Sequence, residues 1–119
     1  MKYAILIYGD ETAGAQATPE QQEQVMNAWW GLEGELQRQE GLRLAGEALQ
    51  PTTTATSVRV KDGKATTTDG PFAETKEQLG GYYLVNCKNL DEAVKWAGKI
   101  PSAGRGPVEV RPIMTFEAP

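Results

Sequence analysis

The chain has 119 residues, with 12 Lys and Arg against 16 Asp and Glu, a net charge of −4 and 39% hydrophobic residues. That length predicts a single domain over residues 1–119 with an ordinary globular composition. An acidic chain without a basic run predicts no nucleic-acid partner. No apolar stretch approaches the length that crosses a bilayer, so we expect no membrane partner either.

Histidine and cysteine usage excludes most catalytic templates. The chain has no histidine and one cysteine, Cys87, so neither a Ser-His-Asp triad nor a zinc site of the usual ligands can form. We expect no metal and no cofactor. A lone cysteine makes no intramolecular disulfide, and a cytoplasmic location is the simplest expectation. Cys87 lies in an apolar, strand-like run, which favours a buried structural thiol over a nucleophile.

The first half of the chain predicts a strand, a loop and a long helix. Residues 2–8 are apolar on both faces, which is typical of a strand in the centre of a sheet. After a loop, Thr18, Pro19 and Gln21 supply an N-cap, a proline at the first helical position and a capping box. The helix should begin at Pro19 and end before Gly41. Its core stripe is Val25, Trp29, Leu32 and Leu36.

Three residues of this helix fall outside the simple core pattern. Trp30 lies about 100° around the helix from Trp29, where it lines a ligand cavity or a subunit contact, or else widens the core face. Gly31 and Gly34 each cost about 1 kcal/mol relative to alanine. They therefore predict a close approach of a packed strand or a partner.

The second half of the chain predicts strands around one more helix. An Asp62-Gly63 turn joins the strands of a Thr-rich hairpin, and Gly80-Gly81 indicates a bulge or close approach in the strand that follows. Asn89 caps the second helix, which ends at Ile100. Its buried side is predicted as Leu90, Ala93, Val94 and Ala97. The expected strands span residues 42–49, 56–61, 64–68, 79–87 and 107–114.

This order of elements predicts an α+β fold. Strand, helix, strand, hairpin, strand, helix, strand is a split βαβ arrangement with an inserted hairpin, which gives an antiparallel sheet with two helices on one face. The central strands are apolar on both sides, so the other face needs a cover as well. We therefore predict a homodimer that associates through its sheets, with a cavity between or beside them.

Residues 68–83, TDGPFAETKEQLGGYY, hold the densest cluster of turn formers and charges in the chain. This run resembles the signature of the DGPF branch of the YCII-related (YciI-like) family, and the similarity extends to residues 2–8, 46–51 and 108–113. The resemblance implies a ferredoxin-like fold that assembles as a dimeric α/β barrel. It also implies a link to extracytoplasmic-function sigma-factor pathways.

In classical YciI-like members, the proposed catalytic pair is a histidine on the first helix with a nearby aspartate. By rough alignment, Trp29 stands near the place of that histidine, and Asp10 is the approximate match to the aspartate. A His-Asp mechanism is therefore not transferable to this chain.

The signature run has two interpretations. In the first interpretation the run is a connector, since Asp69 and Pro71 are typical of a tight turn. Phe72 would then anchor the turn in apolar surface, and Thr75 would cap a short helical turn. As a connector, the run would hold the inserted hairpin to the sheet.

As a site, the same backbone would present reactive side chains. Asp69 or Glu74, made more basic by desolvation, would act as a general base, and Tyr82 would donate a proton. Lys76 or Arg111 would stabilise an enolate or a carboxylate.

Glu47 and Glu109 either join this site or form cross-strand ion pairs with Arg43 and Arg111. The candidate catalytic residues are Asp10, Asp69, Glu74 and Tyr82, and the candidate ligand-binding residues are Trp30, Glu47, Phe72, Lys76, Glu109 and Arg111.

Three functions fit these observations. The first is a small-molecule-binding or regulatory module, which the resemblance links to a sigma-factor pathway. The second is a cofactor-independent lyase or isomerase that uses carboxylates, and the third is a structural protein-interaction dimer. We favour binding, because the missing histidine removes the best catalytic candidate.

Overall fold

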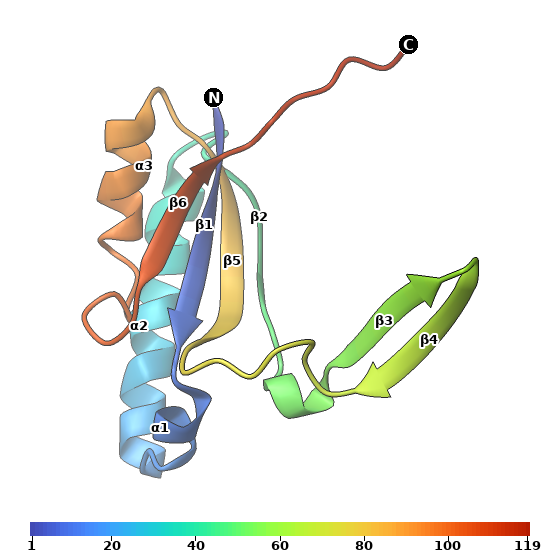
Figure 1. Cartoon of the computed structure of the whole chain (residues 1–119). Helices are drawn as coiled ribbons and strands as arrows, with labels where there is room; N and C mark the ends of the chain where they lie inside the picture. The colour runs from blue at the N-terminus through green and yellow to red at the C-terminus, as the bar shows by residue number, and fades with distance from the viewer.

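The computed structural model describes residues 1–119 and has the predicted α+β architecture of an antiparallel sheet with helices on one face (Figure 1). The sheet consists of β1 (Lys2–Gly9), β2 (Arg43–Ala48), β5 (Gln78–Asn86) and β6 (Val108–Pro112). A separate hairpin consists of β3 (Thr56–Lys61) and β4 (Lys64–Asp69). The helices are α1 (Glu11–Ala15), α2 (Pro19–Arg38) and α3 (Leu90–Ala97), with a 3-10 turn, η1 (Thr52–Thr54). None of the helices is both long and apolar enough to span a bilayer.

The sheet has the strand order β2-β5-β1-β6, and every neighbouring pair is antiparallel. The first strand is therefore central, as predicted. Helix α2 connects β1 to β2, and α3 connects β5 to β6, so the chain makes two split βαβ units. With the hairpin set aside, this is a ferredoxin-like topology.

The start of α2 is confirmed in detail. Thr18 Oγ1 accepts a hydrogen bond from the backbone of Gln21 at 3.2 Å, and Gln21 Oε1 accepts one from the backbone of Thr18 at 2.9 Å. The short helix α1 was not predicted, because its residues read as a loop. Asp10 begins it as an N-cap that accepts from the backbone of Thr12 at 2.9 Å.

The core lies between the sheet and the two longer helices. Its residues alternate along β1 and β5 and follow one stripe of each helix, and its main members are Tyr3, Ile5, Ile7, Leu32, Leu36, Tyr83, Val85, Ala93, Trp96 and Ala97. Leu90 and Val94 of α3 were predicted to be buried, but both are about half exposed. Trp96, which was not predicted, is buried in the core instead. Helix α3 therefore turns its Ala93, Trp96, Ala97 stripe toward the sheet.

Two features of α2 differ from the predictions. A Cβ atom on Gly31 or Gly34 would meet no atom within 4 Å, so no strand of this chain approaches either glycine closely. Trp30 is 66% exposed and does not belong to the core. Because Trp30 is exposed, two of its three predicted roles remain, namely lining a ligand cavity and forming a subunit contact.

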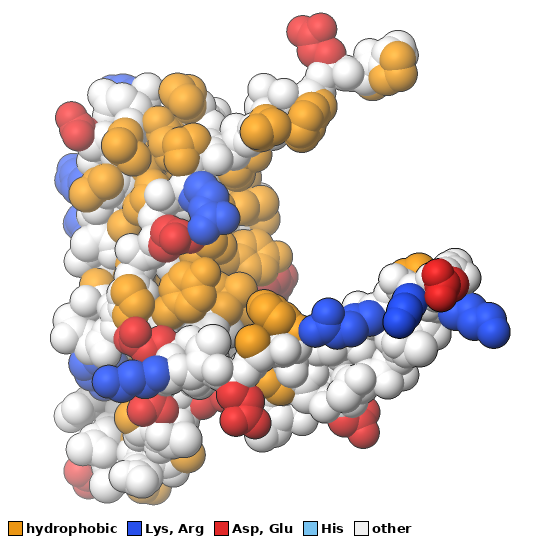
Figure 2. Space-filling view, in the orientation of Figure 1, with side chains coloured by type: hydrophobic (Ala, Val, Ile, Leu, Met, Phe, Trp, Pro, Cys, Tyr) orange, Lys and Arg blue, Asp and Glu red, His pale blue; other side chains and the backbone are white.

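The face of the sheet away from the helices has no cover within the chain. Ala4, Leu6, Tyr82 and Leu84 lie there and are only partly buried. The space-filling view shows hydrophobic surface on the inner side of a U-shaped outline (Figure 2). The two central strands are thus apolar on both faces, as the sequence indicated.

The hairpin and the C-terminal tail form the arms of this U (Figure 1). The hairpin turn has φ values of 51° at Asp62 and 76° at Gly63, which confirms the predicted Asp-Gly turn. A compact domain of 119 residues has a radius of gyration of about 13.5 Å, whereas that of this chain is 16.7 Å. Val60 on the hairpin is 69% exposed and Phe116 in the tail is 85% exposed, so both arms carry unburied apolar groups.

Candidate functional site

A cavity of about 550 Å³ lies between α2 and the edge of the sheet formed by β2 and β5. One wall comes from the helix and the other from the two strands, and the end of β1 with the start of α1 closes one end. The lining residues that matter most are Tyr8, Asp10, Glu11, Met26, Trp29, Trp30, Glu33, Arg43, Gly46, Glu47, Gly81, Tyr82, Tyr83 and Ser102.

The helical wall is a second stripe of α2, beside the core stripe. Met26, Trp29, Trp30 and Glu33 follow one another at i, i+3, i+4 and i+7, which places them on one side of the helix. Trp29 belongs to both stripes, since it also packs against the core. The helix therefore presents a tryptophan pair and a carboxylate to the same cavity.

The strand wall contains two glycines at positions where neighbouring atoms already fill the space of a side chain. A Cβ atom on Gly46 of β2 would lie 2.5 Å from Cδ1 of Tyr83, and one on Gly81 of β5 would lie 3.0 Å from the carbonyl oxygen of Glu47. These close approaches require glycine at both positions. The pairing of β1 with β5 also shifts by one residue beside Gly80, which confirms the bulge predicted from the double glycine.

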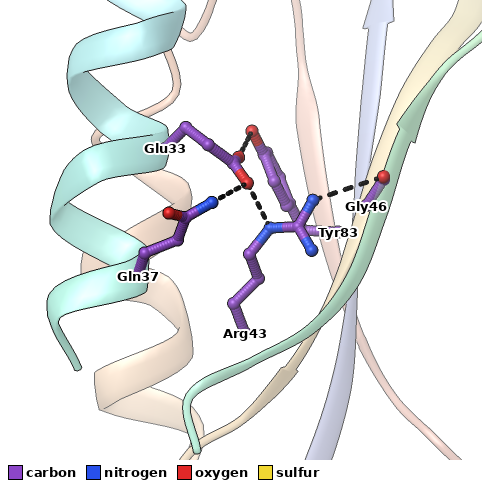
Figure 3. A network of polar contacts seen from close by, with 5 residues as sticks. All are labelled: Glu33, Gln37, Arg43, Gly46 and Tyr83. Carbon is purple, nitrogen blue, oxygen red and sulfur yellow. Dashed lines mark hydrogen bonds and ion pairs between the residues drawn. The ribbon is translucent and has the colours of Figure 1, made fainter. Parts of the chain in front are cut away.

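A polar network joins the two walls (Figure 3). Tyr83 Oη donates to Glu33 Oε2 at 3.0 Å, and Gln37 Nε2 donates to Glu33 Oε1 at 3.3 Å. Arg43 Nε forms an ion pair with Glu33 Oε1, and its Nη2 donates to the carbonyl of Gly46 at 3.4 Å. The side chains of Arg43 and Glu33 are 27% and 16% exposed. Both carboxylate oxygens of Glu33 are therefore already bound by other side chains of the protein.

Tyr83 is a proton donor in this network and not a base. Burial raises the pKa of Tyr83 from 10.0 to about 12, and the hydrogen bond to Glu33 and its negative charge contribute to the shift. The Arg43 guanidinium lies 5.7 Å from the centre of the Tyr83 ring and stacks on it as a cation. At neutral pH the phenol keeps its proton and positions the Glu33 carboxylate.

The remaining carboxylates of the cavity differ in their partners. Asp10 Oδ1 accepts from the Thr12 hydroxyl at 2.6 Å and from its backbone at 2.9 Å, and these bonds hold the Asp10 pKa below its ordinary value. Glu11 accepts from the backbone and the hydroxyl of Thr52, both at 2.8 Å. Glu47 makes no hydrogen bond or ion pair through its side chain.

The structure brings only some of the predicted site residues together. Asp10, Trp30, Glu47 and Tyr82 belong to the cavity lining. Of these, Glu47 and Tyr82 pair with each other on the sheet face away from the helices. The other candidates lie outside its lining: Asp69, Phe72, Glu74, Lys76, Glu109 and Arg111. Asp69 ends the hairpin, and the residues that follow it up to β5 are almost all exposed.

The signature run fastens the base of the hairpin. Gly70 has a φ of 99°, which favours glycine, and its backbone donates to the Ala55 carbonyl at 2.7 Å. Ser57 Oγ donates to the Gly70 carbonyl at 2.8 Å. The connector interpretation is supported here, but two of its details are wrong. Phe72 is 82% exposed and anchors nothing within the chain, and no helical turn follows Thr75.

The predicted cross-strand ion pairs are also wrong. Arg43 pairs with Glu33 on the helix, because their side chains point into the same half-buried space, and Glu47 lies on a different strand face. Arg111 Nη2 lies 2.5 Å from Glu109 Oε1 on the same strand, β6. This pair stands on the uncovered face, opposite Leu6 and Ala4 of β1.

Sequence reasoning missed Glu33 and Tyr83 as site residues and placed Arg43 only in an ion pair. One signal could have found Glu33, which lies three residues after Trp30 on the cavity stripe of α2. Cys87, by contrast, is buried as predicted, and burial, with a contribution from Glu92, raises its pKa from 9.0 to about 11. Its thiol is protonated at neutral pH and structural.

The fold and the cavity define a small α+β protein of ferredoxin-like topology, with an aromatic and acidic cavity between its long helix and the sheet edge. The model of the YCII-related domain matches residues 1–117. An uncharacterised protein of Rhizobium meliloti (strain 1021) is 39% identical over 120 residues, which covers 98% of this chain and 95% of the relative. The chain belongs to the YCII-related family.

Proposed function

We propose that the protein binds a small molecule in the cavity between α2 and the β2-β5 edge and acts as a binding or regulatory module. The observation that carries this proposal is Trp30, which is 66% exposed and yet lines a cavity of about 550 Å³. That volume lies within the usual range of small-molecule sites, about 300 to 1,000 Å³. A tryptophan that contributes little to the core is explained by a ligand that covers it.

The enzyme alternative has weaker support. A lyase or isomerase needs a basic group that is free to accept a proton from the substrate. Asp10 caps α1 and its pKa is lowered, and both oxygens of Glu33 are occupied by protein partners. Tyr83 keeps its proton far above neutral pH. Glu47 pairs in register with Tyr82 on the sheet face away from α2, so it does not supply a free base beside the tryptophan pair.

We also propose that the protein works as a homodimer whose second copy covers the open sheet face. Leu6, Tyr82 and Leu84 give this face its apolar character, and the hairpin and tail extend beyond the sheet as arms that would enclose a partner. A second copy supplies a surface of the same apolar character. This arrangement is the dimeric α/β barrel, and it also underlies the alternative of a purely structural interaction dimer.

The run of residues 68–83 supports assignment to the DGPF branch of the family. The sigma-factor link that this resemblance implies would make the bound molecule a regulatory signal. Recovery of an extracytoplasmic-function sigma factor with the tagged protein would support this part of the proposal, and its absence would leave a ligand-binding module without that pathway.

Binding in the cavity is tested with Nile red, a neutral dye whose fluorescence rises in apolar sites. We expect saturable binding to the wild-type protein and an affinity about tenfold lower for Trp30→Ala, equivalent to about 1.4 kcal/mol. Phe72→Ala is the matched control, because it removes an aromatic side chain that is also exposed but lies outside the cavity. Equal losses in both variants, or no saturable binding to the wild type, would contradict the proposal.

A further inference from the structure

The uncovered face of the sheet has an apolar centre and charged edges. The strand registers place its middle side chains in two rows, each of which crosses all four strands from β2 to β6. The first row is Ala45, Leu84, Ala4 and Arg111, and the second row is Glu47, Tyr82, Leu6 and Glu109. An apolar centre within a polar rim is the usual anatomy of a protein interface.

Two symmetric arrangements place a second copy face to face with this sheet. In the first, the two-fold axis runs along the strands, so each row faces the same row of the partner with the strand order reversed. Glu109 then stands opposite the partner's Glu47. Carboxylates would meet at both edges of the interface, and juxtaposed like charges disfavour association.

In the second arrangement, the two-fold axis crosses the strands between the two rows. Each strand then faces its own copy and the rows exchange, so Glu109 stands opposite the partner's Arg111 and Tyr82 opposite the partner's Leu84. Stacked sheets lie about 10 Å apart, a gap that an arginine and a glutamate span together. Arg111 already pairs with Glu109 of its own strand, and its five N–H donors allow a second carboxylate. The charges therefore favour this arrangement.

The direction of the axis also decides which arms of the U meet. The hairpin and the tail (residues 113–119) leave the sheet from opposite ends of its strands and extend to the same side (Figure 1). An axis across the strands exchanges these ends, so it brings the partner's tail to the hairpin. An axis along the strands would bring hairpin to hairpin and tail to tail.

The hairpin has an apolar face that the chain leaves exposed. Val58, Val60 and Ala65 lie on one side of it, and both valines are exposed. A hairpin of two strands is marginally stable in water by itself, and a further packed element gives it stability. The apolar face of the hairpin is thus a surface that needs a partner.

The tail offers groups that match this surface. Met114 and Phe116 are exposed apolar side chains, and Glu117 is the one charged residue of the tail. The hairpin carries a surplus of cations, namely Arg59, Lys61 and Lys64, over its two aspartates. Apolar groups and opposite charges therefore meet when the tail of one copy lies on the hairpin of the other.

From these charges and the direction of the arms, and resting on the proposed homodimer, we infer that the two-fold axis crosses the strands and that each hairpin receives the tail of the other copy. Phe116 packs on the valine face of the partner's hairpin. Glu109 pairs with the partner's Arg111 at the β6 edge. Both arms, which are exposed in the single chain, are then covered.

Disulfide cross-linking of the arms tests this inference. On mild oxidation, Val60→Cys/Phe116→Cys should form a linked dimer of about twice 12.9 kDa on a non-reducing gel. Each single variant is a matched control and should remain a single chain, since neither two hairpins nor two tails meet. Cys87 is buried and takes no part. A linked dimer from either single variant, or none from the double variant, would overturn the inference.

Charge reversal at the β6 edge gives a second test, read from the concentration dependence of light scattering. Glu109→Arg should weaken the dimer about tenfold, because it places a second cation opposite the partner's Arg111. Glu109→Arg/Arg111→Glu should restore the affinity to within about threefold. Glu35→Arg, which reverses a carboxylate paired with Lys99 on the helical side, is the control and should change nothing. A tighter dimer with Glu109→Arg, or no recovery in the double variant, would contradict the arrangement.

Failure of this inference is distinguishable from failure of the proposed homodimer. If the wild type scatters as a dimer and Leu84→Glu separates it, but the cysteine pair does not link, the copies associate in the other orientation. If the wild type is a single chain in solution, both proposals fail together.

Discussion

The phenol of Tyr83 on β5 donates to the carboxylate of Glu33 on α2 at 3.0 Å, and this bond joins the long helix to a central strand. The partners lie 50 residues apart in the chain. Because Arg43 of β2 meets the same carboxylate, three elements are tied together at one side chain. The cavity wall is thus held in place by protein groups alone.

Tyr83 gives the protein a specific sensitivity to alkaline pH. Its pKa is raised from 10.0 to about 12 in the folded protein, so the unfolded chain releases this proton more readily. The stability contribution is complete below pH 10 and is lost as the pH rises toward 12. Urea unfolding at pH 9 and pH 11 should show a smaller loss of stability for Tyr83→Phe than for the wild type. An equal loss in both proteins would rule out Tyr83 as the source.

Removal of the Glu33 charge should destabilise the protein more than removal of another carboxylate of the same helix. Glu33→Gln leaves the half-buried Arg43 without its counter-charge, and we expect the free energy of unfolding to fall by about 2 kcal/mol. Glu35→Gln on the same helix is the control, since Glu35 pairs at 3.2 Å with Lys99 and both side chains are about 40% exposed. That variant should lose less than about 0.5 kcal/mol. Similar losses by chemical unfolding would contradict the role given to Glu33.

Gly46 of β2 and Gly31 of α2 should respond to alanine in opposite directions. Gly46→Ala places a methyl group against the Tyr83 ring, so we expect a loss of about 1 to 3 kcal/mol and weaker Nile red binding. Gly31→Ala adds a methyl group where nothing lies within 4 Å, and it should stabilise α2 by about 1 kcal/mol. Thermal unfolding of both variants checks the pair. Destabilisation by Gly31→Ala would show that another chain covers that position.

The proposed homodimer depends on the uncovered sheet face. The wild-type protein should scatter light with about twice the chain mass of 12.9 kDa, and Leu84→Glu, which places a charge on that face, should scatter as the single chain. Leu90→Glu is the matched control, because Leu90 lies half exposed on α3 and should leave the assembly intact. A wild-type protein that is monomeric at micromolar concentration would contradict the assembly.

Local signals predicted most of the fold. The capping box of Thr18 and Gln21, the Asp62-Gly63 turn and the alternation along β1 each depend on neighbours in sequence, and each is confirmed. Helix α1 was not predicted, because its five residues include a glycine and no apolar stripe. It is held by its Asp10 cap and by a contact across the fold, in which the backbone N–H of Glu11 donates to Gln78 Oε1 at 3.0 Å.

The site could not be predicted from spacing. Glu33, Arg43 and Tyr83 belong to a helix, an edge strand and an inner strand, and only the packing of α2 on the sheet brings them together. The dense charges of residues 69–77 led us to predict site residues there instead. Those charges are exposed at the base of the hairpin, where solvation and backbone geometry account for them.

The ion pair of Glu33 with Arg43 also keeps the one guanidinium of the cavity lining occupied. Glutamine at position 33 would remove the counter-charge and leave Arg43 free to bind a carboxylate or a phosphate. The residue at this single position of α2 therefore decides whether the cavity offers an anion a partner, while the fold and the aromatic walls stay unchanged.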